Sequence, residues 1–367
     1  MMSTDVAVVG AGPAGSSTAK TIAEKGYDVI LIERDSYPGE NNVCAGGIPK
    51  RIAEEMGVED TIEKEIKSDI LVFPWGRKEI ERDNATVHRR IFDKRLAEIA
   101  VESGAKILTN TIVKDVTVKD DFVLLNSEIA AKIVVFADGP NTLAYRKFRI
   151  GFRPESDKTV VSVVCELEWK NNELESFEMY FDRRISPWGY GWIFPKRNLV
   201  NVGVGCLYSK LNCNIIEMLK YFINDFPLSK YKLHSRKIVW LRSSLIPVSP
   251  AEKIYGERIL VVGDAAGMVD PISGGGIAHA IEGGKIAGEV CVKALEENDF
   301  SENFLSLYDK LWRKTKNYRD ITTRYLLSNI FLYLSKFDEN AFAKLADFGY
   351  GKENKIKKII KLFRTFQ

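Results

Sequence analysis

The sequence predicts an α/β fold: a Rossmann-like dinucleotide-binding domain, an inserted antiparallel β-sheet domain and a C-terminal helical region. Three observations lead to this prediction. The chain opens with an apolar strand, a glycine-rich turn and an Ala-rich helix in DVAVVGAGPAGSSTAK. A second strand followed by a glycine loop, ILVVGDAAGMVDPISGGG, comes about 250 residues downstream. The segment between them carries alternating aromatic and small residues, which are typical of strands.

The order of these motifs divides the 367 residues into three parts. The dinucleotide-binding domain is discontinuous because the sheet domain interrupts it. We expect the dinucleotide domain at 1–70, 85–150 and 245–300, the sheet domain at 71–84 and 151–244, and the helical region at 301–367.

The first strand and helix are joined by the pattern Gly-x-Gly-x-x-Gly. Gly10 permits the tight turn, Gly12 lets the backbone approach a pyrophosphate, and Gly15 lets the helix pack closely on the strand. The helix N-terminus then offers unpaired amides to the phosphates. Glu33 ends the second strand, where a carboxylate accepts hydrogen bonds from ribose hydroxyls, and its charge disfavours a 2′-phosphate. NAD and FAD both remain open at this point.

The second glycine loop favours FAD. An NAD dehydrogenase has no need for this element, whereas a flavin requires groups for its ribityl chain and ring. Asp264 can accept a hydrogen bond from a ribityl hydroxyl, and Gly274, Gly275 and Gly276 can bring amides to the flavin pyrimidine. The helix that begins near Ile277 would stabilise the reduced, anionic ring through its N-terminal dipole.

Two further segments lie between these motifs. A strand at 133–137 ends at Asp138-Gly139, which is either an ordinary turn or a cofactor contact. An amphipathic helix begins at Arg89 and Arg90, one of which can reach the pyrophosphate. The strand–turn–strand that follows places the Val113 backbone where it can touch adenine.

The inserted domain contains the stretch SPWGYGWIFPK at 186–196. In a strand, Trp188, Tyr190, Trp192 and Phe194 share one face, and Gly189 and Gly191 lie on the other. The ring face is either core packing or the wall of a site for a long apolar ligand. We predict that these four aromatic residues bind substrate, and the sequence leaves open which face of the strand meets it.

Composition excludes several classes of protein. The chain has 53 basic and 50 acidic residues, so its net charge of +3 gives no reason to expect a nucleic-acid partner. Its five cysteines are scattered and form no CxxC pair, so we expect no metal site and a reducing, cytoplasmic location. No apolar run is long enough to span a membrane. The basic stretch KENKIKKIIKLFRTFQ is either a packed terminal helix or a peripheral contact with the inner face of the membrane.

Four motifs, in their order along the chain, resemble the FAD-dependent monooxygenase and reductase superfamily of the glutathione reductase and p-hydroxybenzoate hydroxylase type. They are the glycine turn with Glu33, Arg89 with Phe92-Asp93, Asp138-Gly139 and Gly263-Asp264. Two local stretches are similar to the geranylgeranyl reductase branch, namely VCAGGIP at 43–49 and YGWIFPKRNLVNVGVG at 190–205.

This resemblance implies a reductase that saturates the double bonds of geranylgeranyl chains, in archaeal membrane lipids or in polyprenyl precursors. It implies FAD contacts at Ala14, Glu33, Cys44, Ala45, Gly47, Arg89, Val113, Asp264, Gly276 and Ile277. Ala45 stands where many relatives have glycine, which narrows the site above the flavin. Gly267 follows Gly-Asp-Ala-Ala, where hydroxylases of the superfamily often carry histidine. This difference favours a reductase over a hydroxylase.

We expect reduced FAD to donate a hydride to one alkene carbon while a proton reaches the other. Cysteine thiols are mostly protonated at neutral pH, so Cys44 is the candidate donor, although a small buried thiol in a loop is the alternative reading. No second dinucleotide-binding unit is visible, so the reductant is either transiently bound NAD(P)H or a ferredoxin-like carrier protein. Other functions that stay open are an FAD-dependent hydroxylase, a quinone oxidoreductase, and a flavin- or lipid-carrying protein without catalytic activity.

Overall fold

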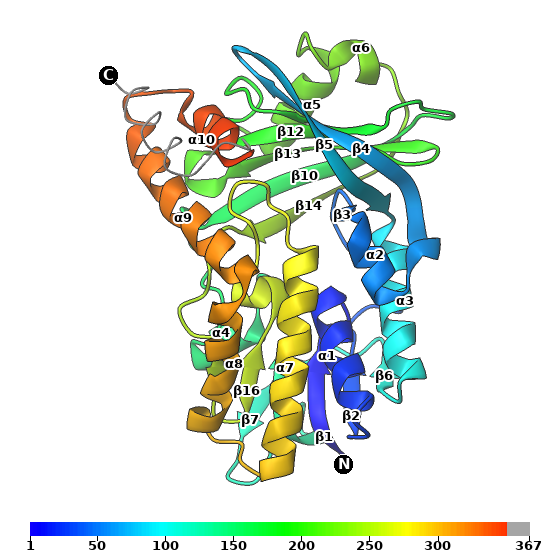
Figure 1. Cartoon of the computed structure of the whole chain (residues 1–367), viewed down its shortest axis with the longest axis vertical. Helices are drawn as coiled ribbons and strands as arrows, with labels where there is room; N and C mark the ends of the chain where they lie inside the picture. The colour runs from blue at the N-terminus through cyan, green and yellow to red at the C-terminus, as the bar shows by residue number, and fades with distance from the viewer. Residues whose placement is uncertain (351–367) are drawn as a thin grey trace.

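Two β-sheets frame the computed structural model, which describes residues 1–350 (Figure 1). The lower sheet carries the glycine-rich turns, and the upper sheet carries the aromatic stretch at 186–196. The basic stretch predicted as a terminal helix or membrane contact, 351–367, lies outside the described residues.

The lower sheet is a parallel sheet built around β1. Strands β16, β9, β1, β2 and β6 run parallel, and their apolar runs (such as VILI in β2) are buried on both faces, as parallel sheets require. This arrangement confirms the predicted Rossmann-like domain. In spatial order the strands are β15 (Tyr255–Gly256), β16 (Ile259–Val261), β9 (Ile129–Phe136), β1 (Met2–Val9), β2 (Val29–Ile32) and β6 (Lys106–Leu108), with β8 (Val123–Leu125) and β7 (Val116–Val118) added antiparallel beside β9.

The upper sheet is antiparallel, with one exception. Strand β11 pairs with β4 in parallel, whereas the other neighbours run antiparallel, so the predicted antiparallel sheet is confirmed apart from this pair. In spatial order the strands are β14 (Ile238–Pro247), β10 (Thr159–Glu168), β13 (Leu199–Leu207), β12 (Gly189–Pro195), β11 (Ser176–Tyr180), β4 (Ile62–Phe73), β5 (Gly76–Val87) and β3 (Gly47–Pro49).

The strands of the upper sheet extend beyond the limits expected from sequence. The β4–β5 hairpin covers 62–87 rather than 71–84, and β14 continues to Pro247 rather than ending at 244. The start of β4, IEKEIKSD, is rich in charged residues and only partly buried. Such charge-rich strands have weak β-propensity, which is why the sequence did not mark their full length.

Helices cover both domains and join them. Helix α9 runs along one side of the molecule from the lower to the upper domain, where α10 lies beside the upper sheet (Figure 1). The helices are α1 (Pro13–Ala23), α2 (Lys50–Met56), α3 (Arg89–Glu102), α4 (Leu143–Phe148), α5 (Ile215–Asn224), α6 (Lys230–Leu233), α7 (Ile277–Glu297), α8 (Glu302–Lys314), α9 (Lys316–Leu334) and α10 (Ala341–Tyr350).

Helices α1 and α7 pack closely because the residues between them are small. A Cβ atom at Gly284 would lie 2.4 Å from the Ala14 carbonyl oxygen, and the Thr18 hydroxyl donates to the Gly284 carbonyl at 3.0 Å. Both helices begin at the same cavity, since Pro13 and Ile277 both line it. Two helix N-termini therefore face one space between the sheets.

Candidate active site

A cavity of about 1190 Å³ lies between the two sheets. It is lined by residues of the glycine turns below and of the aromatic stretch above. Sites for single small molecules typically measure about 300–1,000 Å³. The cavity therefore has room for a dinucleotide and for part of a second ligand.

The turn before α1 has the geometry of a phosphate cradle. Gly10 has a φ of +100°, and a Cβ atom there would lie 2.4 Å from the Ala137 carbonyl oxygen. A Cβ atom at Gly15 would lie 1.9 Å from the Gly10 carbonyl oxygen, whereas one at Gly12 would meet no protein atom within 4 Å. Gly12 and Ala14 line the cavity at the N-terminus of α1, so a phosphate can approach the backbone there.

Glu33 is held with its carboxylate at the cavity. Its Oε2 accepts from the Ala11 amide and its Oε1 from the Asp35 amide, both at 3.0 Å. The side chain is almost completely buried and lines the cavity. This fixed carboxylate is placed to accept from ribose hydroxyls. Val113 lines the cavity as well.

The second glycine loop reaches the same cavity from the other helix. Asp264, Gly275, Gly276 and Ile277 line it, at the N-terminus of the 21-residue helix α7. Burial raises the pKa of the Asp264 carboxyl, and the nearby Arg89 only partly offsets this effect. These residues fit the ribityl chain and the pyrimidine edge of a flavin.

Asp138 has a structural role in addition to its place at the cavity. Its Oδ2 accepts from the Leu143 amide at 2.7 Å, next to the start of α4, and its Oδ1 is buried without a hydrogen-bond partner. Burial raises the pKa of its carboxyl. Asp138 therefore both anchors a turn and lines the cavity, so the two readings of the sequence are compatible.

Cys44 lies in the loop between the two domains, with its thiol held by polar neighbours. Its Sγ accepts from the Gly46 amide at 3.4 Å, and the Arg89 guanidinium lies nearby. The guanidinium makes a bidentate pair with the buried Asp93, with distances of 2.6 and 2.7 Å. Burial alone would lower the pKa of Arg89, but the Asp93 carboxylate outweighs this effect, so the pKa is raised and the guanidinium stays charged. Arg89, Cys44 and Ala45 all line the cavity.

The aromatic face of β12 is the face that looks into the cavity. Tyr190, Trp192 and Phe194 line it, whereas a Cβ atom at Gly191 would lie 3.0 Å from Phe222 of α5. Helix α5 covers the reverse of the strand, so the aromatic face is the one exposed to the cavity. Trp188 is the exception among the four, because it packs on Phe342 of α10 with the ring centroids 5.2 Å apart.

Glycines beside the aromatic wall let the rings and the loop come close. A Cβ atom at Gly47 would lie 2.9 Å from the Phe194 ring, and one at Gly203 would lie 2.2 Å from Trp192 Cζ2. Phe194 stacks on Phe177 of β11 at 3.9 Å between ring centroids. The Trp192 indole thus packs on the glycines of the Gly-x-Gly in β13.

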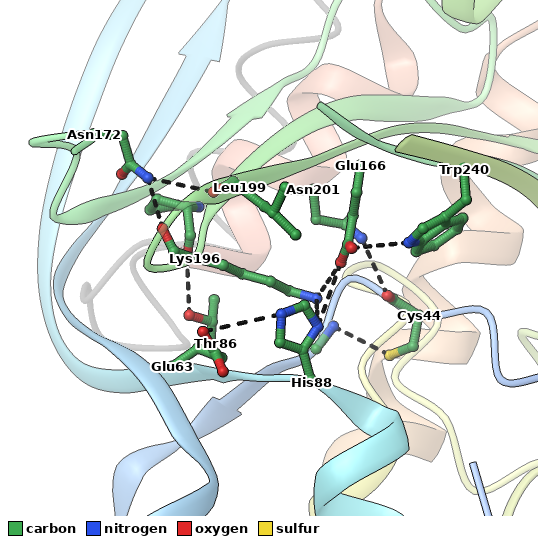
Figure 2. A network of polar contacts seen from close by, with 12 residues as sticks. Cys44, Glu63, Thr86, His88, Glu166, Asn172, Lys196, Leu199, Asn201 and Trp240 are labelled. Carbon is green, nitrogen blue, oxygen red and sulfur yellow. Dashed lines mark hydrogen bonds and ion pairs between the residues drawn. The ribbon is translucent and has the colours of Figure 1, made fainter. Parts of the chain in front are cut away.

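A buried polar network lies next to the end of β12 and was not expected from the sequence (Figure 2). Lys196, 3% exposed, forms an ion pair with Glu166 of β10 and lies 3.2 Å from His88 Nδ1. Trp240 of β14 donates to the second Glu166 oxygen at 2.8 Å. Burial opposes ionisation of Glu166, but Lys196 outweighs it and the pKa of the carboxyl is lowered. The network fastens the end of β12 to β10 and β14.

The far end of the cavity also holds residues that sequence patterns missed. Asp69 and Asn84 of the β4–β5 hairpin line it together with Met179 and Tyr350. Asp69 accepts from Asn84 Nδ2 at 3.2 Å and from Arg82 Nε at 3.3 Å. Burial raises the pKa of Asp69 despite these partners. Within residues 1–350, no group of three His, Cys, Asp or Glu side chains is placed to hold a metal ion.

Comparison with known proteins matches two separate parts of the chain to family models. A family model described as FAD dependent oxidoreductase matches residues 5–144, and one described as geranylgeranyl reductase catalytic domain matches residues 157–242. The first match covers strands and helices of the lower domain together with β3, β4 and β5 of the upper sheet, and the second covers β10 to β13 and part of β14.

Similar whole proteins include curated archaeal sequences. The digeranylgeranylglycerophospholipid reductase 1 of Methanopyrus kandleri is 36% identical over 85% of this chain and 87% of its own length. The digeranylgeranylglycerophospholipid reductase of Methanocaldococcus jannaschii is 37% identical over 89% of this chain and 85% of its own length.

Solved structures share the whole fold. A geranylgeranyl bacteriochlorophyll reductase-like protein from Thermoplasma acidophilum is similar with a TM-score of 0.84 and 26% identity, over 98% of this chain and 96% of that one. A flavin-dependent brominase is similar with a TM-score of 0.74 and 19% identity over 100% of both chains, which concerns the fold alone.

Proposed function

The chain belongs to the digeranylgeranylglycerophospholipid reductase family, and we propose that it is an FAD-dependent reductase that saturates carbon–carbon double bonds of isoprenoid lipid chains. One observation carries the proposal. The residues that fit FAD and the aromatic wall line the same cavity, so a chain lying on the wall is beside the cofactor.

FAD fits the residues present. The open Gly12 turn would take the pyrophosphate, Glu33 the ribose, and Asp264 with Gly275, Gly276 and Ile277 the ribityl chain and ring. When bound and reduced, FAD supplies a hydride. The remaining requirements, which are placement of the alkene, exclusion of water and delivery of a proton, fall to side chains of this protein.

The aromatic wall would place the chain of the substrate. Tyr190, Trp192 and Phe194 present ring faces to the cavity, and Trp192 and Phe194 are fixed by packing on Gly203 and Phe177. An isolated alkene is unactivated, so a rigid apolar surface that holds it in one position supports catalysis by orientation. Trp188 would act indirectly, since it packs against α10.

Cys44 is the proposed proton donor. Its thiol lines the cavity and would transfer its proton to the second alkene carbon, and solvent protons would restore it. The charged Arg89 guanidinium lines the same cavity. Replacing Cys44 with Ala is expected to slow reduction while FAD binding is retained.

The electron donor is proposed to be NAD(P)H or a reduced ferredoxin-like protein. Within the described residues, the parallel sheet contains one glycine-turn βαβ unit, at 2–32, so a nicotinamide would dock transiently rather than in a second domain of this kind. Anaerobic mixing of the FAD-loaded protein with NADH, NADPH or reduced ferredoxin, followed at the flavin absorbance band, identifies the donor.

Peripheral contact with a membrane is proposed through α9. Leu326, Ile330, Tyr333 and Phe337 are exposed at helical spacing on and just beyond this helix. The helix also lines an apolar pocket through Tyr325 and Leu332, so it separates that pocket from the outside. No helix within 1–350 has both the length and the hydropathy needed to span a bilayer. Flotation with lipid vesicles should weaken when Leu326 and Ile330 are replaced by Ser.

The central test is direct reduction of a lipid. The FAD-loaded protein is reduced with dithionite, incubated with a digeranylgeranyl glycerophospholipid, and the products are weighed by mass spectrometry. We expect a series of products whose masses rise in steps of two hydrogens. The Cys44→Ala variant should form much less of these products. An unchanged lipid mass, with the flavin bleached and therefore reduced, would refute the proposal. Peroxide formation stimulated by a phenol would instead indicate a hydroxylase.

A further inference from the structure

Asn201 is a completely buried side chain that no sequence motif marked. It lies on β13 opposite Phe194 of β12, two and four residues before Gly203 and Gly205. Alternate residues of a strand share a face, so Asn201 continues the row of glycines on which the Trp192 indole lies. A buried amide needs partners for its donors and acceptors.

The orientation of the Asn201 amide is fixed by the chemistry of its neighbours. Its Oδ1 accepts from Trp192 Nε1 at 2.9 Å. Its Nδ2 donates to the Cys44 carbonyl oxygen at 3.3 Å (Figure 2). An indole nitrogen can only donate and a carbonyl can only accept, so the reverse orientation would leave both contacts unsatisfied. One side chain thus joins the substrate wall to the Cys44 loop.

The Cys44 loop has few other constraints of this kind. The Gly46 carbonyl accepts from the Val87 amide at 2.8 Å, and the Asn42 side chain donates to Asp93 at 3.2 Å. Between these anchors, Asn201 contacts the Cys44 backbone and the Gly46 amide contacts its sulfur. A shift of the Trp192 indole would therefore be passed to the thiol through Asn201.

We propose that Asn201 is a positioning residue that fixes the position of the Cys44 thiol relative to the Trp192 side chain in the wall of the cavity. The inference rests on the proposed function, because it takes Cys44 as the proton donor. Asn201 itself does not line the cavity, so its effect must pass through its two partners.

The first test measures the thiol without any lipid. The FAD-loaded full chain is treated with iodoacetamide, and alkylation of each cysteine is followed by peptide mass spectrometry. Cys213 is exposed and serves as the internal reference. Asn201→Leu is expected to raise the ratio of Cys44 to Cys213 alkylation rates at least threefold, because the loop loses its anchor.

Two variants make this result specific. Trp192→Phe keeps a ring on the strand but removes the indole N–H that Asn201 accepts, together with the rest of the five-membered ring. It should raise the same ratio by a smaller factor, and it covers the case in which Asn201→Leu does not fold. Asn172→Leu is the matched control, because Asn172 is also a buried amide of this domain but donates to the carbonyls of Lys196 and Leu199 instead. The ratio should stay at the wild-type value in this control.

The second test is a double-mutant cycle in which the rate of single-turnover lipid reduction is measured. Asn201→Leu should lower the rate at least tenfold in the wild-type background and less than twofold in the Cys44→Ala background. Equal losses in both backgrounds would overturn the proposal, as would an alkylation ratio unchanged in both Asn201→Leu and Trp192→Phe. If the wild-type protein reduces no lipid, the proposed function fails, and the alkylation ratio still decides the role of Asn201.

Discussion

Replacing Gly203 with Ala should dislodge the Trp192 indole, because the two occupy the same space. A Cβ atom at Gly203 would lie 2.2 Å from Cζ2 and 2.6 Å from both Cε2 and Cη2 of Trp192. Contacts that short are repulsive, so the ring must move away and its N–H leaves Asn201.

The cost follows from two effects. Overpacking a core by one methyl group costs about 1–3 kcal/mol, and leaving a buried hydrogen-bonding group unpaired costs about 1–3 kcal/mol. We therefore expect Gly203→Ala to lower the free energy of unfolding by about 2–6 kcal/mol. With a slope of about 2 kcal/mol per molar urea, a loss of about 3 kcal/mol moves the midpoint down by about 1.5 M.

Gly205→Ala is the matched control. A Cβ atom there would lie 3.3 Å from Val160 Cγ1 and 3.8 Å from Trp192 Cζ3, which a small movement of the valine can accommodate. Its expected cost is below about 1 kcal/mol, since replacing glycine also restricts the unfolded chain.

The assay is urea unfolding of the full chain, followed by tryptophan fluorescence and by far-UV circular dichroism. Combining Gly203→Ala with Trp192→Phe should recover part of the loss, because a phenyl ring lacks the atoms that collide. If Gly203→Ala unfolds within about 0.5 kcal/mol of the wild type, or if Gly205→Ala is equally damaging, the indole does not lie on Gly203 as described.

Three further predictions concern the cofactor and the buried charges. Gly12→Ala should leave the urea midpoint unchanged but weaken FAD binding at least tenfold by fluorescence titration, because its methyl group meets no protein atom and points into space that the pyrophosphate would fill. Lys196→Met should cost about 3–5 kcal/mol at pH 7 by leaving Glu166 buried without its partner. Lys196 lowers the pKa of Glu166 in the folded state. The stabilisation by this pair is therefore present above the ordinary glutamate pKa of 4.5 and is lost as the pH falls through the pKa of the folded state. The urea midpoints of variant and wild type should converge at acid pH. The pH dependence that Asp69 contributes has the opposite sign. Burial raises its pKa in the folded state above 3.8, so the free energy of unfolding falls as the pH rises through the folded value. Asp69→Asn should therefore be more stable than the wild type at pH 7 but not at pH 3.

Local patterns predicted the cofactor side of the site well. The Gly10, Gly12 and Gly15 turn, Glu33 and the start of α7 at Ile277 were all expected from sequence, and each lies at or beside the cavity. This succeeds because a turn with positive φ, a helix N-terminus and a strand end are set by a few consecutive residues. Whether these residues contact FAD as assigned remains a prediction.

The substrate side was predicted in composition but not in arrangement. The aromatic stretch was singled out, yet Trp188 packs under α10 while its three companions line the cavity, and Asp69 and Asn84 were not expected there at all. Position along a strand gives the side of the sheet, and only the covering helix decides whether that side is core or cavity.

By itself, the sequence determined the two motifs that fold around a dinucleotide, the family, and the aromatic strand at 189–195. Only the tertiary structure showed that α5 covers the glycine face of this strand, and that Asn201 and Cys44, 157 positions apart, are hydrogen-bonded. The Lys196–Glu166 pair, 30 positions apart, is of the same kind. Glycine turns are fixed by local backbone geometry, which adjacent residues specify. Buried polar pairs depend on which strands become neighbours. The order of the strands is decided by the packing of the whole chain, which no short stretch of sequence specifies.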